Sequence, residues 1–508
     1  MNAAAAGGEA AEAARPRHPL LITFSVMLAT MLYSIDWTIA AVALPHMRGT
    51  FSATQDQIGW VITSYIVASA IMMPTAGFLS TRFGRKRVFL FAMSGFIASS
   101  VVCGAANSIE VEVAARIVQG MSGAFLVPLS QAIILDTYPP AEQGKAMALW
   151  GLGSVFGPVI GPTLGGYLTE LMSWRAIFYI NLPVGLLALA GTAIFVPETK
   201  RDPGKRLDWF GFLALAAGIG ALQLMLDRGE RLDWFSSHEI VIEAGIAALG
   251  LYLFTAHILT AGNPFLSPRL FADRNYAVGL VFIFLYGLLT VPTMVLMPPF
   301  MQDLRGFPID TIGLLQSPRG IGLVVALLIG GRVTGRMDPR ILIAVGLAFL
   351  AVSSWEMARW NLDVGAWPIV WTGFVQGAGA GILLVPIQAI AFPALPPHLR
   401  TEAAAVFNLT RSVGSSMGVS IALTLLTRET IASHARLVEH VTPYNENLRY
   451  EAIARGWDLG SIAGLSHIER EIGRQASMLG YAADFRLLAF GAFASILLLL
   501  LVRRTAPR

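Results

Sequence analysis

The segment from residue 19 to residue 45 reads PLLITFSVMLATMLYSIDWTIAAVALP, and Asp36 is its one charged side chain. A helix needs about 20 largely apolar residues to cross the hydrocarbon core of a bilayer, so this segment predicts a transmembrane helix. Arg15 and Arg17 precede it, and Ala41-Val42-Ala43 has the small residues of a signal-peptide cleavage site. Because an apolar run of about 25 residues is too long for the core of a signal peptide, we expect a retained first span.

Comparable apolar runs recur along the 508 residues, and we predict fourteen spans. Their centres lie near Met31, Ile66, Ile97, Ala124, Val159, Leu187, Ala217, Leu249, Leu289, Leu323, Leu347, Gly379, Gly418 and Ser495. Charged residues make up 13% of the chain, about half of the roughly 25% found in soluble domains. The sequence therefore predicts an all-α integral membrane protein. Its single cysteine, Cys103, excludes an intramolecular disulfide.

Basic residues favour the cytoplasmic loops of membrane proteins. With the N-terminus inside, the inner loops and tails hold twenty Lys and Arg residues. The short outer loops hold six, at Arg48, Arg175, Arg228, Arg231, Arg305 and Arg359. We therefore predict that both termini are cytoplasmic. The net charge of +4 follows from these inner loops and implies no nucleic-acid partner.

The two halves of the chain repeat each other. Val118-Gln119-Gly120 recurs as Val375-Gln376-Gly377, and Gly157 and Gly161 recur as Gly414 and Gly418, each 257 residues later. Parallel repeats of this kind build the central sites of many secondary transporters. We predict two six-helix bundles separated by two inserted helices. The expected boundaries are a tail at 1–18, a first bundle at 19–196, an inserted pair with linkers at 197–275, a second bundle at 276–502 with a long outer connection at 428–483, and a tail at 503–508.

Charged side chains inside a membrane are costly, so each is a candidate functional residue. The first half has two that we single out, Asp36 in the first span and Arg116 in the fourth. A buried carboxyl that changes its water contact or its distance from a cation can bind and release a proton. The alternative is a static ion pair that sets the helix register. At the repeat-equivalent positions the second half has Thr290 or Thr293 and Gly373, which predicts that proton coupling belongs to the first half.

Further in-span charges have weaker signals. Arg319 and Arg411 could face an anionic substrate, or they could bond to helix-end carbonyl groups. We expect Glu243, His257 and Glu356 to be solvated or to reach toward the membrane surface.

Glycines repeat every four residues through the fifth span, at Gly153, Gly157, Gly161 and Gly165, with Gly166 following and Pro158 and Pro162 between them. Such a ribbon lets another helix backbone approach closely, and each proline removes a backbone hydrogen bond. Tight packing alone would explain the pattern. A bent, dry seam between the two halves is the functional interpretation.

We find no signature of an enzyme. None of the four lysines lies in a phosphate-binding loop motif. Gly414-Ser415-Ser416-Met417-Gly418 matches a hydrolase pattern that needs a strand-to-helix turn, but it lies in an apolar helix. His434, His440 and His467 lack metal-ligand spacing. We therefore predict no catalytic residue, metal or cofactor, and an ion gradient or a concentration gradient as the energy source.

These motifs together resemble the major facilitator superfamily, and most specifically its fourteen-span drug:proton antiporters of the EmrB type. The resemblance rests on five segments in order: residues 32–45 around Asp36, the loop motif at 77–87, Arg116 to Gly123, Gly153 to Gly166, and Trp174 to Gly185. In this family the first-span acid and the fourth-span arginine are implicated in proton coupling. The loop residues Gly77, Arg82, Gly84, Arg85 and Lys86 match the family's gating loop. Thr81 stands where many members have an aspartate that latches this loop, so this chain lacks the carboxylate of that latch.

The resemblance implies a multidrug exporter of the bacterial inner membrane. It would exchange hydrophobic or amphipathic drugs for protons and work with a periplasmic adaptor (a membrane fusion protein of the EmrA type) and an outer-membrane channel of the TolC type. The charge-mixed segment 428–483 could dock the adaptor or form a simple lid. The alternative function is a dedicated exporter of one metabolite, siderophore or lipid precursor. Candidate substrate contacts are Tyr33, Trp37, Tyr65, Gln131, Tyr286, Gln376, Gln388, Asn408 and Arg411.

Overall fold

The computed structural model describes residues 18–262, 264–334, 336–393, 395–442, 444–445, 457 and 461–501. The first half of the chain contains α2 (Pro19–Phe51), α3 (Gln55–Met72) continued by η1 (Met73–Thr75) and α4 (Ala76–Phe83), α5 (Arg85–Ala105), α6 (Ile109–Gly123) continued by α7 (Leu126–Thr137), α8 (Pro140–Leu171), α9 (Ala176–Tyr179) and α10 (Asn181–Phe195). The middle of the chain contains α11 (Trp209–Arg228), η2 (Trp234–Ser236) and α12 (His238–Thr260).

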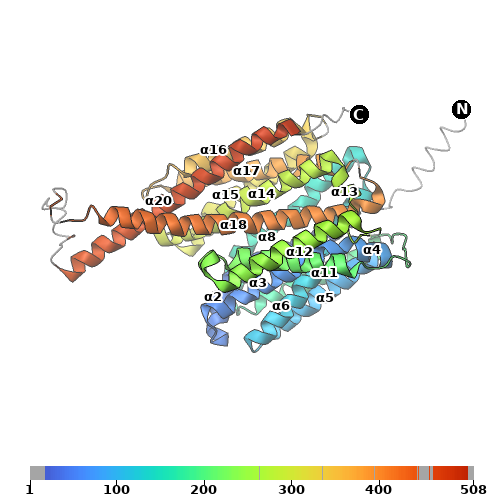
Figure 1. Ribbon diagram of the computed structural model, residues 1–508, viewed down its shortest axis with the longest axis horizontal. Coiled ribbons are helices and arrows are strands. Elements are labelled where there is room, and N and C mark those ends of the chain that lie inside the picture. Colours follow the sequence, from blue (N-terminus) through green and yellow to red (C-terminus); the bar gives the residue numbers. More distant parts are fainter. Residues whose placement is uncertain are drawn as a thin grey trace, which may run out of the picture.

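The second half is built in the same way. It contains α13 (Arg269–Ala272), α14 (Arg274–Pro299) continued by the π-helical turn η3 (Phe300–Leu304), α15 (Ile309–Val333), α16 (Pro339–Met357), α17 (Ala366–Ala391), η4 (Pro397–Leu399), α18 (Arg400–Val438), α20 (Ile462–Leu497) and η6 (Leu498–Leu501). Figure 1 shows these helices running roughly parallel along the length of the molecule.

Thirteen helical segments among the described residues are long and apolar enough to cross a membrane. The remaining predicted span is α8, whose 32 residues also suffice in length; the side chains at 156, 158, 159 and 162 lie outside the described part. Each predicted span centre lies inside one of these segments, from Met31 in α2 to Ser495 in α20, and Ala124 lies at the junction of α6 and α7. The prediction of an all-α membrane protein is confirmed.

Polar side chains begin several helices at the points where apolar periodicity starts. Thr54 and Gln57 form a reciprocal capping box at the start of α3. Asp208 caps α11 and Asp273 caps α14, each through a side-chain oxygen that accepts a backbone N–H. These caps satisfy backbone donors that the bilayer could not satisfy, and so they place the helix starts.

The internal repeat appears in the packing. In the first half, α8 lies against α2, where a Cβ on Gly157 or Gly161 would overlap Ser34 or Thr38. In the second half, Gly414 and Gly418 of α18 lie in the same way against the backbone of α14. The repeated glycines thus form the same kind of close helix pair twice.

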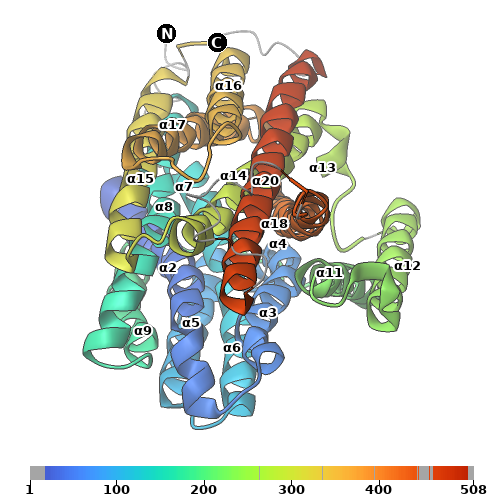
Figure 2. The same ribbon diagram turned by 90° about the vertical axis from the view of Figure 1, so that its left-hand side faces the viewer.

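Helices α11 and α12 lie beside the bundle (Figure 2). α11 packs against α3 of the first half and α18 of the second. Gln223 of α11 donates to the Ser416 hydroxyl of α18, and Thr63 of α3 donates to Asp227 of α11. The inserted pair therefore contacts both halves.

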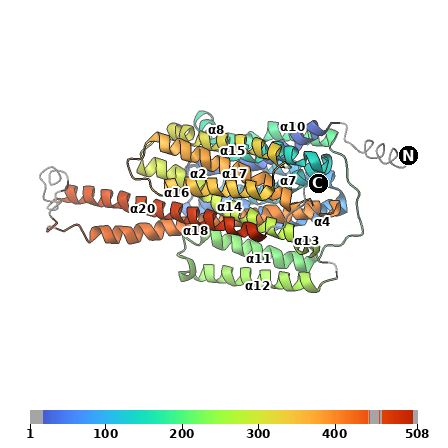
Figure 3. The same cartoon turned by 90° about the horizontal axis from the view of Figure 1, so that it is seen from above.

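Helices α18 and α20 form a long hairpin that projects beyond the other helices at one end of the molecule (Figures 1 and 3). α18 has 39 residues and α20 has 36. At 1.5 Å per residue each is longer than the roughly 30 Å hydrocarbon core. The connection expected at 428–483 is therefore mostly helical, up to Val438 and again from Ile462; within it, residues 443, 446–456 and 458–460 lie outside the described part. We call this end the hairpin end; α2 begins and α20 finishes at the opposite end.

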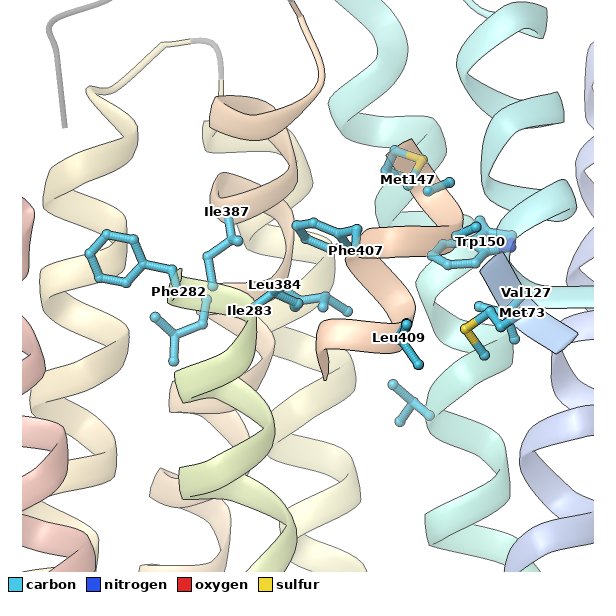
Figure 4. Packing of buried hydrophobic residues seen from close by; sticks show 14 of the residues in the cluster. Met73, Val127, Met147, Trp150, Phe282, Ile283, Leu384, Ile387, Phe407 and Leu409 are labelled. Atoms are coloured by element: carbon cyan, nitrogen blue, oxygen red, sulfur yellow. The ribbon is translucent and has the colours of Figure 1, made fainter. Parts of the chain in front are cut away.

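The first part of α18 lies between the two halves near the opposite end. It packs against α4, η1 and α7 of the first half as well as α14 of its own half. Figure 4 shows Phe407 and Leu409 of α18 between apolar side chains of both halves, namely Met73, Val127, Met147, Trp150, Phe282, Ile283, Leu384 and Ile387. These side chains belong to one continuous buried cluster, so the halves are packed together at the opposite end.

Candidate functional site

Asp36 lies in the interior of the first half and is fully buried. Its carboxylate accepts three hydrogen bonds: Oδ2 from Arg116 Nη1 at 2.6 Å, and Oδ1 from Gln119 Nε2 at 2.9 Å and Asn181 Nδ2 at 2.8 Å. The donors come from α6 and α10, whereas Asp36 lies on α2. A buried carboxylate requires such partners, because an unpaired charge is very costly in an apolar interior.

Arg116 is equally buried and is held on several sides. Its Nε donates to the Val61 carbonyl at 3.0 Å, and Nη1 also donates to Gln119 Oε1 at 2.6 Å. The guanidinium carbon lies 4.2 Å from the centre of the Tyr65 ring, a cation–π distance. The structure thus brings together the two charges that the sequence singled out, in an ion pair that both the static and the proton-coupling interpretations require.

A second buried carboxyl lies beside this pair and was missed in the sequence. Glu112 is fully buried on α6, one turn before Arg116. It lies three residues after the start of its helix, and we did not single it out among the in-span charges of the first half. Its spacing of four residues from Arg116 places both side chains on one helix face, and this spacing could have indicated from the sequence that Glu112 lies beside Arg116.

Three further acidic residues were also not singled out from the sequence. Asp136 and Glu402 lie where the two halves meet, and Asp484 is fully buried in α20.

The second half repeats this arrangement without the charges. Gln376 Nε2 donates to Thr293 Oγ1 at 2.9 Å, just as Gln119 Nε2 donates to Asp36 in the first half. Gln376 lies 257 residues after Gln119, and Thr293 lies 257 residues after Asp36. Thr293 rather than Thr290 is therefore the structural counterpart of Asp36. Arg319 Nη2 donates to the Thr290 carbonyl at 2.7 Å, so it bonds to a helix carbonyl group, but in the interior of α14 rather than at a helix end as expected. A small cavity beside Gly373 and Arg319 lies where the first half has its arginine.

Several of the substrate-contact candidates lie between the two halves. Asn408 Nδ2 of α18 donates to Gln131 Oε1 of α7 at 2.8 Å, which links the halves directly. Arg411, one turn further along α18, lies within electrostatic range of the Tyr33 and Tyr286 hydroxyl groups. These five residues share one interface.

The other candidates contact different groups, although the Tyr65 ring also lies 5.9 Å from the ring of Tyr33. Tyr65 packs on Arg116 and so belongs to the Asp36 cluster. Gln376 and Gln388 are buried inside the second half. Trp37 is half-buried against the core.

The predicted gating loop lies at the opposite end, between α4 and α5. Arg85 forms an ion pair with Asp136 at 2.5 Å, and its Nε donates to Thr401 Oγ1 at 3.1 Å. Arg400 of the second half contacts the other oxygen of Asp136 at 2.7 Å. Asp136 thus joins one arginine from each half, and it ties this loop to the second half in the absence of an acid at position 81.

The rest of the loop is held locally. Thr81 Oγ1 donates to the Gly77 carbonyl in its own helix. A Cβ on Gly77 would lie 2.9 Å from the Glu402 backbone, and Gly84 has a φ of +94°, so both positions favour glycine. Lys86 donates to the Ala193 carbonyl and Arg82 to that of Lys205.

The glycine ribbon of α8 packs within the first half, which corrects the expected seam between the halves. Gly153, Gly157, Gly161 and Gly165 all face α2. The second half meets α8 elsewhere, where Gly151 faces Leu327 of α15. The physical reason is the four-residue period, which keeps one face of α8 on one partner. Gly166 has no atom near its missing side chain, and the side chains of Pro158 and Pro162 lie outside the described part.

Two of the three peripheral charges are paired rather than solvated. Glu243 is buried and lies 3.6 Å from Arg228, and His257 Nε2 lies 2.8 Å from Asp208. These contacts form because α11 and α12 pack together, which the single sequence did not reveal. Glu356 pairs at the surface with Arg359, as a solvated residue would.

Comparison with known proteins agrees with this architecture. Residues 26–419 match the family model described as Major Facilitator Superfamily. The multidrug export protein EmrB of Escherichia coli (strain K12) is 36% identical over 433 residues, which cover 84% of each chain. The fatty acid resistance protein FarB of Neisseria gonorrhoeae is 33% identical over 435 residues, 85% of each chain.

Solved structures share the fold at low identity. The proton:xylose symporter XylE aligns with a TM-score of 0.61 at 14% identity, covering 94% of this chain and 96% of that one. The family model spans most of the chain, and the EmrB and FarB relatives exceed 30% identity. The protein therefore belongs to the Major Facilitator Superfamily of membrane transporters.

Proposed function

We propose that this protein exports hydrophobic and amphipathic drugs across the bacterial inner membrane in exchange for protons. The observation that carries the proposal is the buried Asp36–Arg116 ion pair, with its amide donors from α6 and α10. Relatives named as multidrug export proteins support the substrate class. The hairpin end is then periplasmic, and the opposite end, with both termini, is cytoplasmic.

Protonation of Asp36 would couple the ion gradient to helix movement. A neutral carboxyl no longer needs three donors, so α2 can shift relative to α6 and α10. The glycine face of α8 lies on α2, and α8 also contacts α15 of the second half. A shift of α2 can therefore move the bundle at 19–196 against the bundle at 276–502. One proton crossing supplies about 2.3 kcal/mol per 100 mV of membrane potential.

Substrate would bind between the halves, where Tyr33, Tyr286 and Arg411 lie close to the Gln131–Asn408 contact. Among the ion pairs of the described residues, neither Arg319 nor Arg411 takes part. Both can therefore attract an anionic headgroup. The relative named as a fatty acid resistance protein favours amphipathic anions as one class of substrate.

The test measures substrate-induced proton release from proteoliposomes that contain the purified protein. Asp36→Asn keeps the shape of the side chain but cannot change its charge, and we expect it to abolish proton release. Asp56→Asn, at an exposed position on α3, is the matched control and should behave as wild type. Wild-type proton release by Asp36→Asn would exclude this residue as the coupling site.

The alternative, a dedicated exporter of one metabolite, siderophore or lipid precursor, uses the same coupling. Susceptibility profiling of a deletion strain separates the two. Sensitivity to several unrelated apolar toxins supports multidrug export, and no change in sensitivity supports the dedicated exporter.

The projecting hairpin is the proposed docking surface for a periplasmic adaptor of the membrane fusion protein type, which would continue into an outer-membrane channel. Ile431 and Ile462 are 65% and 88% exposed there, and exposed apolar side chains in water commonly mark a protein interface. Pull-down in mild detergent should recover the adaptor with the wild type and less of it with an Ile431→Ser/Ile462→Ser variant. Equal recovery would mean that the hairpin is a lid.

A further inference from the structure

We propose that Glu112 is a second proton-binding group in the first half, and that Arg116 alternates between Asp36 and Glu112 during transport. This inference rests on the proposed proton antiport, and it adds a residue and a proton route to it. It starts from a pair of unsatisfied groups next to the Asp36–Arg116 ion pair.

The two unsatisfied groups are complementary. Neither carboxyl oxygen of Glu112 accepts a hydrogen bond from an N–H or O–H group among the described residues, although the side chain is fully buried. The weak S–H donor of Cys103 lies beside it. The Nη2 atom of Arg116 also has none, while Nη1 of the same guanidinium is bonded to Asp36. Residues four apart on a helix are neighbours on one face, so a rotation of the Arg116 side chain can bring it to Glu112.

Charge balance requires a proton at this site. One guanidinium cannot neutralise two buried carboxylates, and a buried unpaired charge is very costly. With Arg116 bound to Asp36, Glu112 carries the proton. The titratable and charged groups that face Glu112 are Cys103 of α5, Arg116 of α6, Asp36 of α2 and Arg175 at the start of α9.

The exchange conserves charge and atoms. The O–H bond of Glu112 breaks and an O–H bond forms on Asp36, while Arg116 leaves the Asp36 carboxylate and pairs with the Glu112 carboxylate. The first half keeps one ion pair and one neutral acid in both states. Asp36, freed from its arginine, can then move with α2.

Glu112 is also the carboxyl of the two that is nearer to water at the hairpin end. α6 begins at Ile109, directly after the turn that follows α5 at that end. Arg175 Nη2 donates to the Ala106 carbonyl in this turn at 3.0 Å, and its side chain is partly exposed. The thiol of Cys103 lies between Glu112 and the amide of Gln119, 3.7 Å from Gln119 Oε1. A proton from the hairpin side can therefore reach Glu112 before Asp36.

The experiment compares Glu112→Gln with Glu110→Gln in proteoliposomes. Glu110 lies two residues earlier on α6 and is exposed, so it is the matched control. Glutamine imitates the protonated carboxyl that this conformation contains, so we expect an unchanged melting temperature and substrate counterflow within about twofold of wild type. We expect substrate-induced proton release to fall by about tenfold or more, since a positioned proton-transfer group contributes at least that factor.

The outcomes separate this inference from the proposed function. Absence of proton release in the wild type overturns both. If the wild type releases protons and Glu112→Gln releases them equally well, only the role of Glu112 is overturned. The same role is overturned if Glu112→Gln loses both substrate counterflow and proton release, because that result would indicate a purely structural residue. If Glu112→Gln does not fold, Glu112→Asp replaces it: a shifted dependence of transport on the pH at the hairpin side supports the proposal, and an unchanged dependence overturns it.

Discussion

The residues around the Asp36 carboxylate donate the hydrogen bonds that water would donate to an exposed carboxylate. A hydrogen bond to a charged group contributes about 1.5–3 kcal/mol, and Asp36 accepts one each from Arg116, Gln119 and Asn181. A site of this kind is stable with the carboxyl charged and is weakened when it becomes neutral. This difference is what a proton-driven cycle needs.

Asp208 offers a test at the scale of one residue outside the membrane spans. Burial alone would raise the pKa of Asp208, but hydrogen bonds from the Gly211 backbone, His257 and the Phe265 backbone outweigh it, and the pKa is lowered. An acid whose folded pKa lies below its unfolded value of about 3.9 stabilises the fold above that pH and loses this contribution as the pH falls.

Asparagine can still cap α11, but it lacks the charge that the His257 side chain and the Gly211 and Phe265 backbone donors stabilise. We therefore expect Asp208→Asn to destabilise the protein at pH 7 by about 1 kcal/mol, the usual difference between a charged and a neutral hydrogen bond. Thermal unfolding in detergent between pH 7 and pH 3 measures this, and the difference from wild type should shrink toward acid pH. Asp363→Asn, at an exposed loop position, is the control. A constant difference across the pH range would contradict the assignment.

At the scale of the helix, α8 depends on the absence of side chains along one face. Gly153 and Gly157 pack on backbone atoms of Met27 and Ser34 in α2, and Gly161 packs on the Thr38 side chain. Ser34 Oγ donates to the Ser154 carbonyl and Thr38 Oγ1 to the Gly157 carbonyl, at 2.7 and 2.9 Å. Close approach and these interhelical hydrogen bonds hold the pair together without a hydrophobic driving force.

Gly157→Ala should therefore separate α2 from α8, because its Cβ would overlap the Ser34 carbonyl. We expect a loss of about 1–3 kcal/mol, as for other overpacked sites, and slower transport. Gly166→Ala is the matched control on the same helix, since nothing lies within 4 Å of its Cβ. Melting temperature and drug transport of both variants check this, and equal stability would show that the helix pair can open at little cost.

At the scale of the whole molecule, the two halves are joined at the end opposite the hairpin. Asp136 links Arg85 of the first half to Arg400 of the second, and Phe407 lies in the apolar cluster between the halves. Under the proposed orientation this conformation is closed toward the cytoplasm. Alternating access then requires Asp136 to release one arginine.

We expect Asp136→Asn to favour the conformation that is open at this end. Losing charge pairs worth about 1–2 kcal/mol changes a conformational ratio by roughly five- to thirtyfold. A cysteine introduced at the buried Val127 in a Cys103→Ser background reports the opening through its labelling rate from the cytoplasmic side. Asp202→Asn, exposed at the same end, should label as the Val127→Cys parent does. Unchanged labelling of the Asp136 variant would mean that the apolar packing alone keeps this end closed.

The sequence alone predicted the spans, the repeat and the candidate pair of Asp36 and Arg116, because each leaves a pattern in the sequence itself. Apolar runs must be about 20 residues long to cross a bilayer, and a charge such as Asp36 stands out against them. Glycines at a four-residue period reveal a close helix contact whatever the partner.

Only the tertiary structure decided which surfaces meet. It placed the α8 glycines on α2 instead of between the halves, paired Glu243 and His257, and showed Thr293 as the counterpart of Asp36. It also showed Asp136 between two arginines and Glu112 buried beside Arg116. A charged residue near a helix end is expected from the sequence to be solvated. Whether it is buried depends on helices that are distant in the chain. The physical reason is that burial and pairing of a charge are set by neighbours in space, which one sequence without its fold does not specify.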